Sequence, residues 1–138
     1  MPPRHACLPL AVSALLAACG PGFEVESNPP VRQGYCTLES RPSVRVTVVD
    51  ARGHLQREAR VTFTLDATPE RSALCNGIHL RTDPPCDRWV PNYEAPGLYV
   101  LTATSADGTR TARQEVTVGK TSDGCHVITE DVRLTLPD

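Results

Sequence analysis

The sequence predicts an all-β fold, an antiparallel β-sandwich of about seven strands. From Ser43 onward, short runs alternate apolar and polar side chains with a period of two, which is typical of half-buried strands. Glycine, proline and aspartate interrupt these runs at short intervals, and no segment beyond the N-terminal region repeats apolar residues with the helical period of 3.6. Short strands separated by turns in this way are typical of a two-layered sandwich.

The first two runs have the clearest alternation. Their inward-facing residues are Val44, Val46 and Val48, and then Ala59, Val61, Phe63 and Leu65. Residues 50–53, with the sequence Asp-Ala-Arg-Gly, supply a turn after the first run. We therefore expect the two runs to pair as antiparallel neighbours.

Further strands are expected in the second half of the chain. The expected segments are 78–81, 89–90, 98–104, 110–118 and a final run carrying Val132, Leu134 and Leu136. His126, next to Cys125, is also expected on a strand. Tyr99 lies two residues before Leu101 and shares its face, so its ring is expected in the core with its hydroxyl bonded to a backbone group.

Residues 1–18 have the features of a bacterial export signal: a basic residue near the start, an apolar stretch of about ten residues and small residues before a cleavage point. The stretch is shorter than the roughly 20 residues of a membrane-spanning helix. The segment Leu16-Ala17-Ala18-Cys19 resembles the lipobox of bacterial lipoproteins, whose cysteine is acylated after the signal is removed. This resemblance implies that Cys19 is the lipidated first residue of a membrane-anchored, cell-envelope lipoprotein.

Residues 20–35 are rich in glycine, proline and asparagine and have no apolar periodicity, which predicts a flexible tether. The chain then divides into a signal at 1–18, a lipidated cysteine with its tether at 19–42, and a β-sandwich domain at 43–138. In lipoproteins of this kind an aspartate after the cysteine often signals retention at the inner membrane. Gly20 at that position favours the outer membrane.

Four of the six cysteines remain once Cys7 is assigned to the signal and Cys19 to the lipid. An even number of cysteines in an oxidising compartment predicts disulfides. Of the three possible connectivities we favour two bridges that join Cys75 to Cys86 and Cys36 to Cys125.

Several short motifs together resemble the carboxypeptidase regulatory-like, prealbumin-type β-sandwich domains. They are Val-x-Asp50-x-x-Gly53, Ala59-x-Val61, Pro96-Gly97-x-Tyr99-x-Leu101, and Gly108 followed by a Val-x-Val strand. The resemblance implies a non-catalytic module that serves folding, adhesion or binding. Residues 54–58 depart from the pattern, in which a proline and a small residue commonly follow the glycine, so a generic immunoglobulin-like sandwich stays an alternative.

Two other functions are alternatives to this interpretation. The prealbumin-type fold includes hydroxyisourate hydrolases, which end in Tyr-Arg-Gly-Ser, whereas this chain ends Thr-Leu-Pro-Asp, so no catalytic residue is assigned and no enzyme is expected. A metal-binding envelope protein would use ligands from the set Cys75, His79, Cys86, Cys125 and His126. Structural zinc sites have tighter pairs such as C-x2-C, so neither a metal nor another cofactor is expected.

The composition also bears on partners. The net charge is −2, aromatic residues make up 4% of the chain, and the arginines are scattered singly. These features provide neither the basic surface nor the stacking platforms that nucleic acid requires. The expected partners are the membrane, through the lipid on Cys19, and an envelope protein or surface ligand.

Overall fold

A computed structural model describes residues 35–75 and 81–138, which belong to one compact unit. The expected signal, Cys19 and residues 20–34 lie outside the described residues, as does most of the strand expected at 78–81. Within the described part of the chain there is no helix that is long and apolar enough to span a bilayer.

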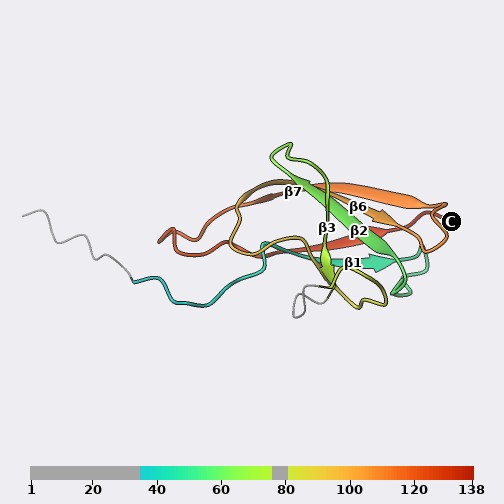
Figure 1. The fold of residues 1–138 in the computed structure, drawn as a ribbon, viewed down its shortest axis with the longest axis horizontal. Helices are drawn as coiled ribbons and strands as arrows, with labels where there is room; N and C mark the ends of the chain where they lie inside the picture. The colour runs from blue at the N-terminus through green and yellow to red at the C-terminus, as the bar shows by residue number, and fades with distance from the viewer. Residues whose placement is uncertain (1–34, 76–80) are drawn as a thin grey trace, which may run out of the picture. The chain divides into compact units, whose positions relative to one another are not determined.

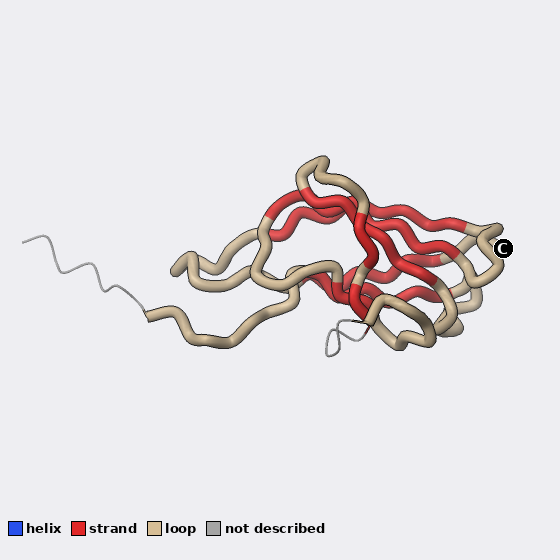
Figure 2. Tube along the Cα trace, in the orientation of Figure 1, coloured by secondary structure: helices blue, strands red, loops and turns tan. Residues whose placement is uncertain are grey.

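The described residues form eight strands in two four-stranded sheets, so the all-β class is confirmed (Figure 2). The strands are β1 (Val44–Val49), β2 (Arg60–Leu65), β3 (Arg71–Ser72), β4 (Leu74–Cys75), β5 (Trp89–Val90), β6 (Gly97–Thr104), β7 (Thr111–Val118) and β8 (Glu130–Thr135). One sheet has the order β4-β5-β1-β8 and the other has the order β3-β2-β6-β7. Figure 1 labels the strands of the second sheet together with β1.

The expected pairing of the first two runs is wrong, because β1 and β2 belong to different sheets. After the turn at 50–53 the chain returns beside β1 only briefly, with Leu55 bridged to Val49 and the Gln56 N–H donating to the Val48 carbonyl at 2.9 Å. It then crosses to the opposite sheet to begin β2. The apolar faces of the two runs therefore bury each other across the sandwich and not side by side within one sheet.

The neighbours of β1 are the short β5 and the last strand, β8. β8 lies parallel to β1, with Val132 opposite Val46 and Leu134 opposite Val48, so this sheet is mixed where an antiparallel one was expected. A parallel neighbour requires a long crossover. Here the whole second sheet, from β2 to β7, lies in sequence between the two strands.

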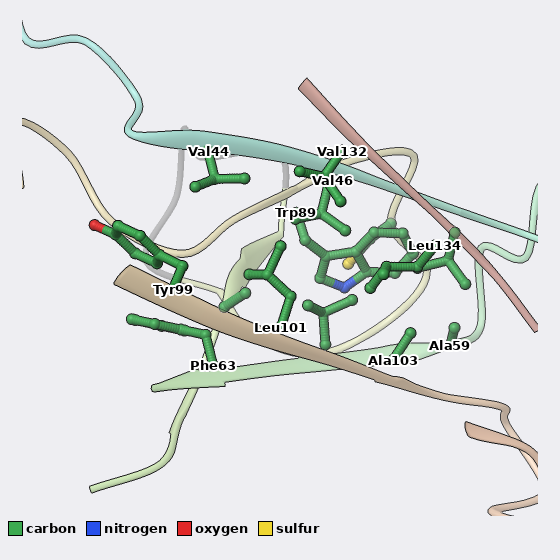
Figure 3. Packing of buried hydrophobic residues seen from close by; sticks show 14 of the residues in the cluster. Val44, Val46, Ala59, Phe63, Trp89, Tyr99, Leu101, Ala103, Val132 and Leu134 are labelled. Atoms are coloured by element: carbon green, nitrogen blue, oxygen red, sulfur yellow. The ribbon is translucent and has the colours of Figure 1, made fainter. Parts of the chain in front are cut away.

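The core lies between the inner faces of the two sheets, and the alternating residues named from the sequence line it. Val44, Val46 and Leu101 are fully buried, and Trp89 from β5 fills the space between β1 and β6 (Figure 3). Leu65 and Val116 are only partly buried at the margin of this cluster. The faces predicted from the period of two are thus confirmed.

Tyr99 is a core residue, as expected. Its ring is fully buried and stacks on Phe63, with the ring centroids 5.9 Å apart. Its hydroxyl donates to the Ala95 carbonyl at 2.8 Å, and burial raises the pKa of the hydroxyl above its ordinary value.

The start of β6 needs a glycine. Gly97 has φ 138°, a conformation that residues with a Cβ rarely adopt, and a Cβ there would lie 2.7 Å from the Leu65 Cδ1 atom. This close approach lets the Leu98 N–H donate to the Asp66 carboxylate at 2.8 Å. The Pro96-Gly97 pair therefore fixes the register of β6 on β2.

We expect Tyr99→Ala to lower the free energy of unfolding by about 3 to 5 kcal/mol, because it leaves a cavity between the sheets. Tyr99→Phe keeps the ring, removes only the bond to Ala95, and should cost about 0.5 to 1.5 kcal/mol. Denaturant unfolding of the two variants beside the parent measures both values. A near-neutral Tyr99→Ala would contradict the core role of this ring.

Candidate functional site

The most organised polar cluster lies where the N-terminal segment meets the sandwich. Cys36 is bonded to Cys125, with the two Cα atoms 5.2 Å apart and a sequence separation of 89. The second disulfide joins Cys75 to Cys86. The favoured connectivity is therefore confirmed, and the first bridge attaches the segment before β1 to the loop between β7 and β8.

Three side chains form a hydrogen-bonded chain beside this disulfide. The Thr37 Oγ1 and His126 Nε2 atoms are 2.8 Å apart, and His126 Nδ1 is 2.8 Å from Glu94 Oε1. His126 is 7% exposed, whereas Thr37 lies on the surface. We call the disulfide Cys36–Cys125 together with Thr37, His126 and Glu94 the N-terminal latch.

Glu94 is the centre of the latch because it accepts three hydrogen bonds from two segments, the N-terminal segment and the loop before β8. The backbone N–H of Arg41 donates to it at 2.7 Å and that of Val127 at 3.1 Å, in addition to His126. These bonds favour the ionised form, so the Arg41 N–H first and His126 second hold the pKa of Glu94 below its usual value. One carboxylate thus joins the N-terminal segment, the loop before β6 and the loop before β8.

The Glu94 carboxylate fixes one proton of the imidazole. An ionised Glu94 can only accept, so His126 Nδ1 carries a proton and donates it, and Nε2 lies within hydrogen-bond distance of the Thr37 hydroxyl. The order carboxylate, imidazole, hydroxyl also occurs in hydrolase triads, which need further donors for the oxyanion. Here the backbone N–H groups of Arg41 and Val127 donate to Glu94. The arrangement holds the N-terminal segment in place.

A shallow pocket of about 400 Å³ adjoins the latch. Its lining residues are Glu39, Ser40, Arg41, Pro42, Arg45, Thr121, Val127, Ile128 and Thr129. The two guanidinium groups already face acids, Arg41 with Glu39 at 3.4 Å and Arg45 with Asp131 at 3.6 Å. The pocket is therefore nearly balanced in charge, and Pro42, Val127 and the half-exposed Ile128 form its apolar part.

The metal-ligand candidates do not come together in the described residues. Cys75, Cys86 and Cys125 are half-cystines, so their sulfurs are not free to bind a metal, and His79 lies outside the described residues. His126 has both ring nitrogens in hydrogen bonds. No group of three or more histidine, cysteine or acidic residues in residues 35–75 and 81–138 is placed to hold a metal ion.

Sequence reasoning missed Thr37 and Glu94 and placed His126 wrongly. His126 lies in the loop before β8 and not on a strand, because its backbone carbonyl accepts from Thr121 in a tight turn. One signal for Thr37 was present: a Cys36–Cys125 bridge brings the next residue of each segment, Thr37 and His126, close together. Glu94 has no such signal, since only the folded loop brings it to His126.

Comparison with known proteins gave no relatives: no protein family matches the sequence, and neither the curated proteins nor the solved structures contain a match.

We expect the latch to make stability depend on pH in the acid range. The folded-state pKa of Glu94 lies below the reference value of 4.5, so its ionised form stabilises the fold above that pH. This contribution is lost as the pH falls through the lower, folded-state pKa. Unfolding free energies measured between about pH 6 and pH 2 should show a weaker acid dependence for Glu94→Gln than for the parent.

Asp107→Asn provides the matched control for this measurement. Ser105 and Thr109 lower the pKa of Asp107 to about 2 in a turn that is not part of the latch. Its substitution should leave the Glu94 contribution in place. An acid dependence of Glu94→Gln equal to that of the parent would contradict the role given to Glu94.

Proposed function

We propose that the protein is a lipoprotein of the cell envelope, anchored through a lipid on Cys19, whose β-sandwich is a non-catalytic structural or binding module. The observation that carries this proposal is the segment Leu16 to Cys19 at the end of an export-type signal. Gly20 after the cysteine favours the outer membrane, as the pattern in this class of protein implies.

One feature of the fold supports an exported protein. Both described disulfides are of the kind that persists in oxidising compartments such as the periplasm. The tether expected from the sequence between Cys19 and Cys36, treated as a flexible chain, would have a root-mean-square reach of about 20 to 24 Å. The lipid would hold the sandwich just off the membrane surface, and the N-terminal latch joins the tether to the domain.

The surface supports a binding or structural module with a protein or surface ligand as its partner. Several exposed arginines are paired with acids, including Arg45 with Asp131, Arg57 with Asp87 and Arg113 with Glu115. Such balanced pairs leave little free positive charge for nucleic acid. The polar cluster with the most hydrogen bonds, the latch, is accounted for by the attachment of the N-terminal segment.

Cys19→Ser should abolish incorporation of a fatty-acid probe and move the protein from the detergent phase to the aqueous phase, because the acylated sulfur is removed. The matched control is Cys7→Ser, which replaces the cysteine inside the signal and should leave labelling unchanged. Labelling and phase partitioning of both variants in bacterial cells test the proposal. A Cys19→Ser protein that is still labelled would show that the lipid, if present, is elsewhere.

A further inference from the structure

The longest edge of the sandwich is β7, at one end of the sheet β3-β2-β6-β7. Figure 1 shows β2, β6 and β7 following one another across this layer. β7 has eight residues, whereas β3 at the opposite edge has two. A long strand at an edge presents unpaired backbone groups that can accept another strand.

The direction of these backbone groups follows from the bonds of β6. The N–H and carbonyl of Leu98 both bond to Asp66, on the side of β2. Successive residues of a strand direct their backbone N–H and carbonyl groups to opposite sides, so those of Tyr99 and Leu101 face β7. Their partners on β7, Val116 and Gln114, direct the same groups back to β6.

The residues between those partners on β7 therefore direct their N–H and carbonyl groups away from the sheet. They are Thr111, Arg113, Glu115 and Thr117. Gly119, two residues after Thr117, follows the same alternation: its carbonyl points away from β6 and accepts from the Ile128 N–H outside the sheet. No bond from the four outward-facing backbones to another described residue is found.

The sequence of this edge is complementary to itself about Gln114. One residue away on either side are Arg113 and Glu115, two away are Ala112 and Val116, and three away are Thr111 and Thr117. Arg113 and Glu115 are exposed on the outer face, and Ala112 and Val116 are partly buried on the inner face. An antiparallel copy of β7 would place each residue opposite a chemically matching one.

We propose that β7 pairs with β7 of a second copy of this chain, in an antiparallel homodimer whose two-fold axis passes through Gln114. Arg113 of each copy lies opposite Glu115 of the other, and Ala112 lies opposite Val116. Each of the four outward-facing residues lies opposite an outward-facing residue of the other copy. The N–H and carbonyl groups of the two strands can therefore bond to each other. The interface is isologous and closes as a dimer.

Charge selects this register over its neighbours. A shift that centres the axis on Arg113 or on Glu115 sets that residue opposite its own copy, and like charges directly opposite are unfavourable. A shift by one position would set inward-facing residues of one copy beside outward-facing residues of the other. Only the register centred on Gln114 matches charge, size and face together.

The other long edge does not have this property. β8 centred on Val132 would set Asp131 opposite Arg133, but Glu130 would lie opposite the buried Leu134. Once two β7 strands are joined, the extended sheet ends on each side in the two-residue β3. The assembly therefore stops at two copies and does not grow into a fibre.

A disulfide cross-link tests the register. In the proposed dimer the two Gln114 residues form a pair without mutual hydrogen bonds, with Cα atoms about 4.5 Å apart, which a disulfide can bridge. The two Arg113 residues are offset by two positions and lie about 8 Å apart, beyond that range. On mild oxidation of the full chain, Gln114→Cys should give about tenfold more covalent dimer than Arg113→Cys.

The parent chain, oxidised in the same way, sets the background from Cys7 and Cys19. Equal cross-linking of the two variants, or none above this background, would overturn the proposal. More cross-linking of Arg113→Cys than of Gln114→Cys would show a different register and would overturn it as well.

Charge reversal tests the partner. Arg113→Glu makes both opposed positions acidic and Glu115→Arg makes both basic, so each variant should self-associate about tenfold less than the parent. A mixture of the two variants restores opposite charges across the interface and should recover the dimer. Co-purification of an untagged full-length chain with a tagged one measures each combination.

Arg60→Glu is the control, since it makes the same change in net charge as Arg113→Glu at an exposed residue of β2. It should not affect co-purification with the parent chain. Single variants that associate as well as the parent, or a mixture that fails to associate while the parent does, would overturn the proposal. These outcomes are independent of the lipid on Cys19, which the labelling experiment tests separately.

Discussion

The fold depends on the burial of two apolar strand faces against each other. β1 contributes valines on alternate positions, and β2 and β6 contribute the opposing face with Phe63, Tyr99 and Leu101. Apolar surface removed from water stabilises by roughly 25 cal/mol per Å², so packing these faces across the sandwich is the largest favourable term available to this chain. The sheet order follows from it: β8 repeats the alternation of β1, and lies beside it facing the same core.

The N-terminal latch holds a segment that the packing of the two sheets does not hold. Residues 35–40 are exposed and would detach easily if only backbone bonds held them. The disulfide from Cys36 reaches the loop after β7, and the chain-entropy treatment gives a bridge of this span about 4.6 kcal/mol. Glu94 and His126 then fix the same segment through side chains. A pull on the chain at Cys36 is therefore shared between β1 and the loop before β8.

The sequence predicted which side chains of a strand face the core better than it predicted which strands lie side by side. A period of two states which side chains share a surface, and Val44, Val46 and Val48 were placed correctly on that basis. The period does not show which strand lies alongside, so the predicted pairing of the first two runs was wrong. After the short return at Leu55, the chain crosses to the opposite sheet. Cysteine number predicted two disulfides but left three connectivities open, and the favoured one is the one that the fold contains. Glu94 was not predictable, because its bonds join segments that no periodicity or motif connects.

The charges on β7 explain how a long edge can be both protected and selective. Natural edge strands are often shielded by charges, which repel most incoming strands. On β7 the charged residues are one arginine and one glutamate, which pair within the strand at 3.3 Å and cancel in net charge. An incoming strand is then accepted only if it brings the opposite charge to each position. The strand that meets this condition in the opposite direction, with matching small and β-branched neighbours, is another copy of β7.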